Sequence, residues 1–216
     1  MKIAIDGPSG SGKSTLAKLL AKKLSIYYLD TGSMYRSAAY AALQQGVDIS
    51  NESEVAALMS RTQFVTEYED GEQQNYIDGV NVMQLIRTPQ ISKAASDISA
   101  HPCVRYKLVD MQREVAQNYD IVLDGRDIGT YVLPDADYKF YLTADAAVRA
   151  KRRFLEDAGK NTGQSFEDVL EEMKKRDYND SHRSLAPLCQ ADDAILIDTT
   201  DINIEGVVSL IIEYLK

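Results

Sequence analysis

The sequence predicts an α/β protein built on a doubly wound, parallel, five-stranded sheet with helices on both faces. Three observations predict this class: short apolar runs alternate with helical segments, a glycine-rich pattern joins the first strand to the first helix, and one stretch changes to a two-residue period. That stretch predicts a small inserted antiparallel meander of three strands, and a glycine-containing loop predicts a short lid. At 216 residues the chain can form one substantial core. We expect a single domain over 1–216, with its core at 1–36, 85–148 and 164–216, an insert at 37–84, and a lid at 149–163.

The chain is organised around the stretch 7–14, which follows the pattern G-x-x-x-x-G-K-S. The apolar run 1–6 before it suits a buried strand, and leucines recur at helical spacing after it. In that context the glycines let successive backbone N–H groups turn inward, and the new helix adds its positive end. We predict that nucleotide phosphates bind here; a flexible Gly/Ser linker is the alternative. The expected binding residues are Gly7, Pro8, Ser9, Gly10, Ser11, Gly12, Lys13, Ser14 and Thr15.

Two side chains of this stretch predict its chemistry. Lys13 is long enough to reach the outer phosphates, and the hydroxyl of Ser14 is suited to bind magnesium. Without a nucleotide we expect Lys13 to be solvated, so its removal should cost little stability.

The next segments predict one short strand and two helices. The strand at 26–29 leads into 30–36, which we expect to be a functional loop. The alanine-rich run 37–43 predicts a helix, and Gly46 suits its C-terminal cap. A capping-box pattern at 51–54 predicts a further helix that ends near Arg61.

The stretch 63–84 has the period of β-strands. Aromatic and β-branched residues alternate there with polar ones, and the pairs Asp70-Gly71 and Asp78-Gly79 interrupt the alternation. Asp-Gly is a strong signal for a tight hairpin turn. We therefore place the meander at about 63–84.

Beyond the meander the chain returns to alternating helices and strands. Thr88-Pro89 and His101-Pro102 each begin a helix, because proline suits the first helical turn. The remaining elements are strands at 121–123, 138–142 and 194–197, a basic helix with Arg149, Arg152 and Arg153, a helix from Ser165 to about His182, and a helix at 204–215. Parallel sheets bind ligands at the carboxyl ends of their strands. The candidate functional loops are therefore those at 7–14, 30–36 and 124–127.

Composition limits the kind of partner. A net charge of −9 argues against nucleic acid, whose binding needs a surplus of lysine and arginine. Cys103 and Cys189 lie far apart without the spacing of metal ligands, which is typical of reduced thiols. No apolar run approaches the length of a membrane span. We expect a cytoplasmic monomer that binds neither nucleic acid nor membranes.

Arginines beside turns and helix ends suggest what the phosphate loop serves. A GTPase would need N-K-x-D, and no Asn-Lys pair occurs in the chain. A transferase that binds two nucleotides must neutralise two sets of phosphates, which a local arginine cluster could do. Solvated surface arginines are the alternative. The candidates are Arg36, Arg87, Arg105, Arg126, Arg176 and Arg183.

With these motifs the sequence resembles the bacterial-type cytidylate kinases, a family of P-loop nucleoside monophosphate kinases. The resemblance extends nearly end to end, and its D-G-R-D-x-G-T and R-D-x-x-D-x-x-R stretches are more specific than the phosphate loop. The meander is similar to the substrate-side insert of that family. The residues that carry the resemblance are 6–14, 30–36, 86–88, 94–96, Val104-Arg105, 124–130, Arg176-Asp177, Asp180, Arg183 and 186–188.

The resemblance implies roles for individual residues. The acceptor phosphate would be surrounded by Thr31, Arg36, Arg126 and Arg183; cytosine would be read by Ser96, Arg105 and Asp127; the sugar would meet Arg176 and Asp180; and the donor phosphates would be covered by the lid arginines Arg152 and Arg153. The implied catalytic residues are Lys13, Arg126, Arg152, Arg153 and Arg183. Thr31 replaces a serine that is common in the family, and it keeps the hydroxyl.

Several of these roles have bland alternatives. Asp127 could be a structural partner of Arg126 instead of a base-reading residue. Arg176, Asp180 and Arg183 share a helix face, which also suits a salt-bridged surface. Asp124 could hold magnesium through water, or it could be a structural aspartate.

The activity that the resemblance implies is phosphorylation of CMP and dCMP by ATP with Mg²⁺, giving CDP and dCDP. A kinase for another acceptor such as UMP or AMP is one alternative. A nucleotide-binding switch protein with little turnover is another.

Overall fold

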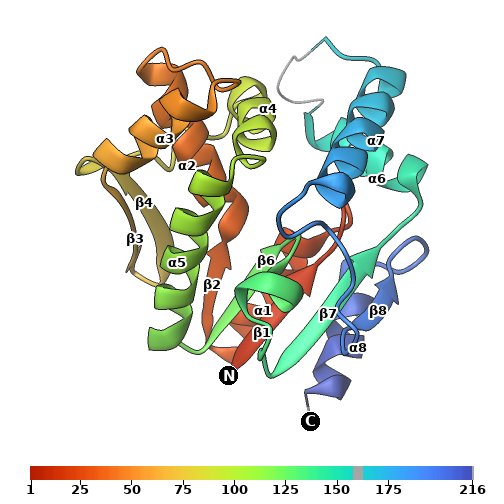
Figure 1. Cartoon of the computed structure of the whole chain (residues 1–216). Coiled ribbons are helices and arrows are strands. Elements are labelled where there is room, and N and C mark those ends of the chain that lie inside the picture. The colour runs from red at the N-terminus through yellow and green to blue at the C-terminus, as the bar shows by residue number, and fades with distance from the viewer. Residues whose placement is uncertain (158–162, 216) are drawn as a thin grey trace. The chain divides into compact units, whose positions relative to one another are not determined.

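The computed structural model describes residues 1–157 and 163–215 (Figure 1). The contacts between residues divide the chain into two compact units. The first unit comprises Met1–Ile26 and Asp120–Lys216, and the second comprises Tyr27–Tyr119. The first holds β1 (Lys2–Asp6), α1 (Lys13–Leu24), β6 (Ile121–Gly125), the single π-helical turn η1 (Ile128–Val132), β7 (Tyr138–Thr143), α6 (Ala146–Asp157), α7 (Phe166–His182), β8 (Ile195–Asp198) and α8 (Ile204–Tyr214). The second holds β2 (Tyr27–Asp30), α2 (Thr31–Gln44), α3 (Glu52–Arg61), β3 (Phe64–Glu69), β4 (Glu72–Ile77), β5 (Val80–Asn81), α4 (Pro89–Ile98) and α5 (Pro102–Asn118). The expected division into core, insert and lid stays a prediction.

A five-stranded sheet in the order β2-β6-β1-β7-β8 confirms the predicted fold class. Within the first unit, β1 pairs in parallel with β6 and β7, and β7 pairs in parallel with β8. Ile3, Ile5 and Phe140 are fully or almost fully buried, as in a sheet that is covered on both faces. The register places Asp6 opposite Gly125, so the loops that follow β1 and β6 leave the same edge side by side.

The turn from β1 into α1 depends on glycine. Gly7 has φ +145°, and a Cβ there would lie 2.0 Å from the carbonyl oxygen of Leu142. Gly12 has φ +91° with open space around its Cα, and it caps α1, whose Leu16 and Leu20 are buried. The first glycine is therefore required by close approach as well as by its dihedral angle, and the second by its dihedral angle alone.

Helix α2 begins earlier than predicted. We expected 30–36 to be a loop, and this was wrong: the helix starts at Thr31, because the Oδ1 of Asp30 accepts the N–H of Ser33 at 2.9 Å. At the other end Gly46 lies in the left-handed region, as predicted. Its N–H donates to Leu43 O at 3.3 Å, and the next N–H closes the Schellman pattern.

The other predicted caps are present. Asn51 caps α3 by accepting the N–H groups of Ser53 and Glu54. The expected reciprocal bond is missing there, since Glu54 accepts from the Asn51 side-chain amide instead. Thr88 caps α4, and Ser165 caps α7 in a full capping box.

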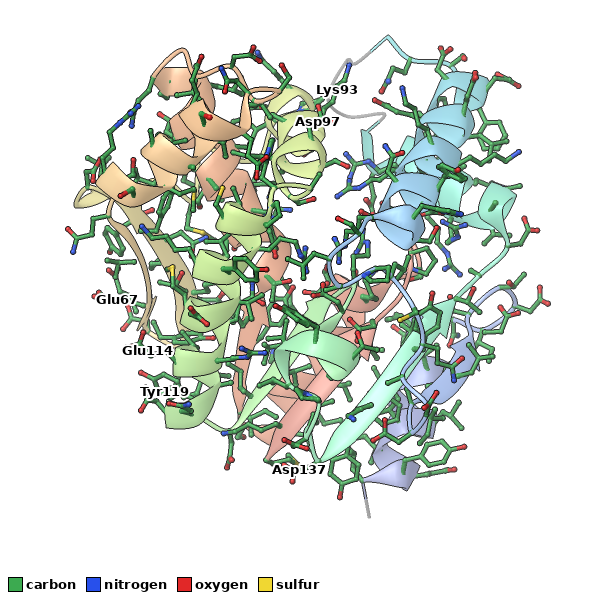
Figure 2. The ribbon with its side chains drawn as sticks, viewed as in Figure 1. Glu67, Lys93, Asp97, Glu114, Tyr119 and Asp137 are labelled. Atoms are coloured by element: carbon green, nitrogen blue, oxygen red, sulfur yellow. The ribbon has the colours of Figure 1, made fainter. Side chains whose placement is uncertain are left out.

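The stretch 63–84 forms the predicted three-stranded antiparallel sheet, in the order β3-β4-β5. Both Asp-Gly pairs lie in the turns with positive φ at each residue, which matches the right-handed twist of a hairpin. The rings of Tyr27, Tyr68 and Tyr119 pack together. Tyr119, which is labelled in Figure 2, directly follows α5. This small sheet is therefore anchored within the second unit.

Among the described residues, no helix combines the length and the apolar character that a bilayer crossing requires. Cys103 and Cys189 are both free thiols.

Gly7→Ala should lower the free energy of unfolding by about 3 kcal/mol or more, because the new methyl group clashes with Leu142 O and the dihedral angle is strained. The matched variant Gly12→Ala adds strain without a clash and should cost about 1 kcal/mol. Urea unfolding of both variants measures the difference. Equal costs would mean that the contact with Leu142 O does not constrain the loop.

Candidate active site

The lysine of the phosphate loop is buried rather than solvated, contrary to our expectation. Lys13 is only 5% exposed, and its Nζ donates to Pro8 O at 2.7 Å and to Ser11 Oγ at 3.4 Å. Burial, with the nearby charge of Arg126, lowers the pKa of Lys13 to about 7. The loop thus holds a cation whose charged form is disfavoured until an anion comes close.

Two oxygen-bearing side chains meet beside the loop. Ser14, in the first turn of α1, donates from Oγ to the Oδ2 of Asp124 at 2.7 Å. Asp124 lies in β6, next to β1 in the sheet. A hydroxyl and a carboxylate are ligands that suit a hard cation such as Mg²⁺.

A buried carboxylate joins the end of β1 to the turn after β6. Asp6 accepts the N–H of Ile128 at 2.8 Å and the N–H of Gly129 at 2.7 Å. Burial raises the pKa of Asp6 to about 6, although both N–H groups act in the opposite direction. Since η1 begins at Ile128, Asp6 also fixes the position of Asp127 just before it.

The arginine that follows β6 is paired with α7. Arg126 Nε donates to the Oδ2 of Asp180 at 2.8 Å, and both side chains are largely buried. Burial alone would raise the pKa of Asp180, but Arg126 and Arg176 outweigh it and hold that pKa below its usual value. Arg176 also contributes to the lowered pKa of Lys13, so its charge acts on both groups.

A second buried pair joins Asp127 to the end of α7. Arg183 Nη2 donates to the Oδ1 of Asp127 at 2.9 Å, and Arg183 Nε donates to Ala186 O at 2.7 Å. Asp127 therefore has a structural partner in Arg183, and the alternative in which it pairs with Arg126 stays a prediction. Arg183 occupies the C-cap of α7 rather than its last turn.

Sequence reasoning assigned no role to a third pair, which contacts the phosphate loop itself. Arg149 Nη1 donates to the Oδ2 of Asp177 at 2.5 Å and to Ser9 O at 2.9 Å, and its Nε donates to Ala144 O at 2.9 Å. Asp177 in turn accepts the N–H of Ser9 at 3.3 Å. The only signal in the sequence was the place of Asp177 next to Arg176 in the R-D-x-x-D-x-x-R stretch.

Arg152, an expected lid residue, is bound near the same loop. It donates to both the carbonyl oxygen and the Oγ1 of Thr199, and Thr199 Oγ1 donates to Ser11 O at 3.2 Å. Arg153 lies next to it on α6. Part of the expected lid at 149–163, including Gly159, lies outside the described residues, so the role of these arginines as a lid stays a prediction.

The second unit holds the other expected acceptor residues. Arg36 Nη2 donates to the Oδ2 of Asp30 at 2.7 Å, and Thr31 is buried at the start of α2. Arg105 on α5 is 1% exposed, with its guanidinium 5.7 Å from the ring centroid of Tyr35. Ser96 lies half-buried on α4.

Lys93 and Asp97, labelled in Figure 2, are exposed on the same helix as Ser96.

The contacts and charge interactions described above bring eight of the expected site residues together in the first unit. They are Lys13, Ser14, Asp124, Arg126, Asp127, Arg176, Asp180 and Arg183. That one acceptor meets residues of both units stays a prediction.

Comparison with known proteins supports both the fold and the family. A structure of an uncharacterized protein from Eubacterium ventriosum is similar with a TM-score of 0.56 at 16% identity, covering 100% of this chain and 98% of that one. A shikimate kinase from Bacteroides thetaiotaomicron is similar with a TM-score of 0.50 at 15% identity, with the same coverage. These similarities, together with the phosphate loop between β1 and α1, show that the chain has a P-loop α/β fold.

Sequence similarity is much stronger. A family model described as cytidylate kinase matches residues 3–216. The cytidylate kinase of Lactobacillus johnsonii is 45% identical over 216 residues, covering 100% of this chain and 94% of that protein. The cytidylate kinase of Desulfitobacterium hafniense is 46% identical over 214 residues, covering 98% of this chain and 91% of that protein. The chain belongs to the cytidylate kinase family, as the resemblance of its motifs predicted.

The buried carboxylate of Asp6 should make stability depend on pH. Its pKa is about 6 in the folded protein against 3.8 in the unfolded chain. Between these values the folded protein holds a proton that the unfolded chain has lost, so this group lowers the free energy of unfolding as pH rises. Asp6→Asn removes this titration. The free energy of unfolding of the unmutated protein, minus that of Asp6→Asn, should therefore fall by about 2 kcal/mol from about pH 4 to about pH 7.

Urea unfolding across this pH range measures the difference. Asp135→Asn, an exposed carboxylate in the same unit, serves as the control. A difference between the native protein and Asp6→Asn that stays constant over the range would contradict the raised pKa.

Proposed function

We propose that this protein transfers the terminal phosphoryl group of ATP to CMP and dCMP, giving CDP and dCDP. Membership of the cytidylate kinase family over nearly the whole chain carries this proposal. It is supported by a phosphate loop that lies beside buried arginines paired with aspartates. The family membership speaks against the alternatives of a UMP or AMP kinase and of a switch protein.

The donor phosphates would bind at the loop 7–14. Its turned backbone and the N-terminus of α1 offer N–H groups to an anion. The lowered pKa of Lys13 supports this role, because a bound phosphate would restore the charged form that burial disfavours. Lys13 would then leave Pro8 O and Ser11 Oγ to contact the phosphates.

Ser14 and Asp124 would hold the magnesium ion that accompanies ATP, Ser14 directly and Asp124 through water, and the ion would neutralise charge on the donor phosphates. This use of Asp124 fits its bond to Ser14 better than a purely structural role would. The described residues contain no cluster of three or more histidine, cysteine or carboxylate side chains that could hold a metal ion.

The arginines would bind the acceptor phosphate by exchanging one anion for another. Arg126, Arg183 and Arg36 each contact an aspartate in this structure, and a phosphate can take over such a guanidinium with similar geometry. Positive charge around the transferring group then stabilises the transition state. The acceptor phosphate is already ionised, so the site needs no strong general base. Arg152 would join the donor side by leaving Thr199 when a lid closes, and Arg153 would join it from the same helix.

Asp127 would read the base, together with Ser96 and Arg105. The amine of cytosine can donate a hydrogen bond to an ionised carboxylate, whereas the oxygen that uracil presents there is repelled by the carboxylate. Arg176 and Asp180 would meet the sugar. The burial of Asp127 supports strong discrimination, because a wrong base would place an acceptor oxygen against a carboxylate that is shielded from water.

A panel of nucleoside monophosphates tests the proposed function. With ATP and Mg²⁺, release of ADP should be fast with CMP and dCMP and orders of magnitude slower with UMP and AMP. Lys13→Met should stay folded and lose about two powers of ten in turnover, since it lacks the charge on the transferring group. Lys18→Met, an exposed lysine on the same helix, is the control. Equal rates with CMP and UMP would rule out the proposed specificity.

Asp127→Asn should lower the specificity constant for CMP by a factor that corresponds to about 2–3 kcal/mol of transition-state binding. It should also reduce the ratio of the specificity constants for CMP and UMP, because the amide can donate to the uracil oxygen. The variant also weakens the bond from Arg183, so Arg183→Met serves as the comparison. Arg183→Met should slow CMP and UMP equally and leave their ratio unchanged. If Asp127→Asn behaves like Arg183→Met, Asp127 supports Arg183 and does not read the base.

A further inference from the structure

The inner face of β4 buries amides where a strand that covers a core would bury apolar side chains. Its three buried residues are Gln73, Asn75 and Ile77, and only the last is apolar. Gln73 is 7% exposed and Asn75 is 2% exposed. Burying an amide is unfavourable unless its hydrogen bonds are satisfied. The partners of these two amides therefore indicate what this face of the meander does.

Gln73 binds the junction between β2 and α2. Its Oε1 accepts the N–H of Asp30 at 2.8 Å, and its Nε2 donates to Ser33 Oγ at 2.9 Å and to Asn75 Oδ1 at 3.1 Å. Because a backbone N–H can only donate, the orientation of the Gln73 amide is fixed by Asp30.

Asn75 binds the next turn of the same helix. Its Nδ2 donates to Ser33 Oγ at 2.9 Å and to Ser37 Oγ at 3.3 Å, and its Oδ1 also accepts from Thr66 Oγ1 at 3.0 Å. Ser33 Oγ gives its one proton to Asp30 O at 2.7 Å and accepts from both amides. That hydroxyl has no further bonding capacity, and the Nε2 of Gln73 also donates to Asp30 O at 3.4 Å.

The network reaches an expected substrate residue through Asp30. The Oδ1 of Asp30 caps α2 at Ser33, and its Oδ2 holds Arg36 Nη2 at 2.7 Å. Gln73 holds the backbone N–H of that same aspartate. A chain of hydrogen bonds therefore runs from the meander through Asp30 to the Arg36 guanidinium, entirely within the second unit.

We propose that Gln73 and Asn75 are positioning residues, which hold the first turns of α2, and through Asp30 the guanidinium of Arg36, in place for the acceptor phosphate. Directional bonds fix the position of a helix end more tightly than apolar contacts do, and small displacements at a phosphate site are costly. The inference rests on the proposed function, which assigns Arg36 to the acceptor phosphate. It gives the meander a role as the support of the acceptor side.

Gln73→Met tests the proposal, because methionine fills a similar volume and makes none of the four side-chain hydrogen bonds of Gln73. The KM for CMP, and the Kd for CMP measured by calorimetry without ATP, should both rise about tenfold while the KM for ATP changes by less than about twofold. Gln74→Met is the matched control: it lies on the opposite face of β4, where its Oε1 accepts from Asn81. That control should bind CMP normally. A lowered melting temperature in Gln73→Met with an unchanged Kd for CMP, or an equal rise in both KM values, would overturn the proposal.

Ser33→Ala provides a second variant. We expect it to keep helix α2, because alanine is the best helix former. It removes the shared hydroxyl and should show the same selective loss of CMP affinity; normal CMP binding would overturn the proposal even if Gln73→Met does not fold. Arg36→Met separates this inference from the proposed function. If Arg36→Met leaves CMP binding unchanged, the assignment of the acceptor side fails, and the positioning role fails with it. If Arg36→Met weakens CMP binding while Gln73→Met and Ser33→Ala do not, only the positioning role is overturned.

Discussion

Positive charge is concentrated at the carboxyl ends of β1 and β6, and the protein balances it with its own carboxylates. Arg126 and Arg176 disfavour the charged form of Lys13, while Asp124 and Asp6 favour it. Each carboxylate is in turn held in place: Asp6 by two backbone N–H groups, and Asp124 by Ser14. These bonds, and that of Arg126 to Asp180, connect β1, α1, β6, η1 and α7 within the first unit.

The same arrangement recurs at four arginines, each of which contacts an aspartate and is at least partly buried. Arg126 contacts Asp180, Arg183 contacts Asp127, Arg149 contacts Asp177, and in the second unit Arg36 contacts Asp30. Buried ion pairs contribute little net stability, because desolvation offsets much of their attraction. Such pairs can therefore exchange partners at small cost, which suits a protein whose substrates carry phosphates. The aspartates keep each guanidinium oriented in the meantime.

Features set by local sequence could be predicted, and features set by long-range contacts could not. The phosphate loop, the Asp-Gly turns and the cap at Ser165 depend on residues a few positions apart. The start of α2 was missed because Thr31-Gly32-Ser33 has low intrinsic helix propensity, and the Asp30 cap overrides it.

At the candidate site, the residue types were predictable but their partners were not. The partner of Asp127 depends on where the end of α7 lies in the folded chain. The bond from Lys13 to Pro8 O likewise depends on the folded path of the loop. The roles of Gln73 and Asn75 could not be predicted for another reason. A two-residue period indicates which residues share a face of the strand, but a face with polar side chains is expected to be exposed to solvent. Ser9 shows what such long-range contacts imply thermodynamically. Its N–H donates to Asp177 and its carbonyl accepts from Arg149, so a phosphate that competes for that N–H also weakens the hold of α7 on the loop. Thermodynamic linkage makes this reciprocal: any change in α7 that loosens its hold on Ser9 alters phosphate affinity by the same factor by which the phosphate loosens α7.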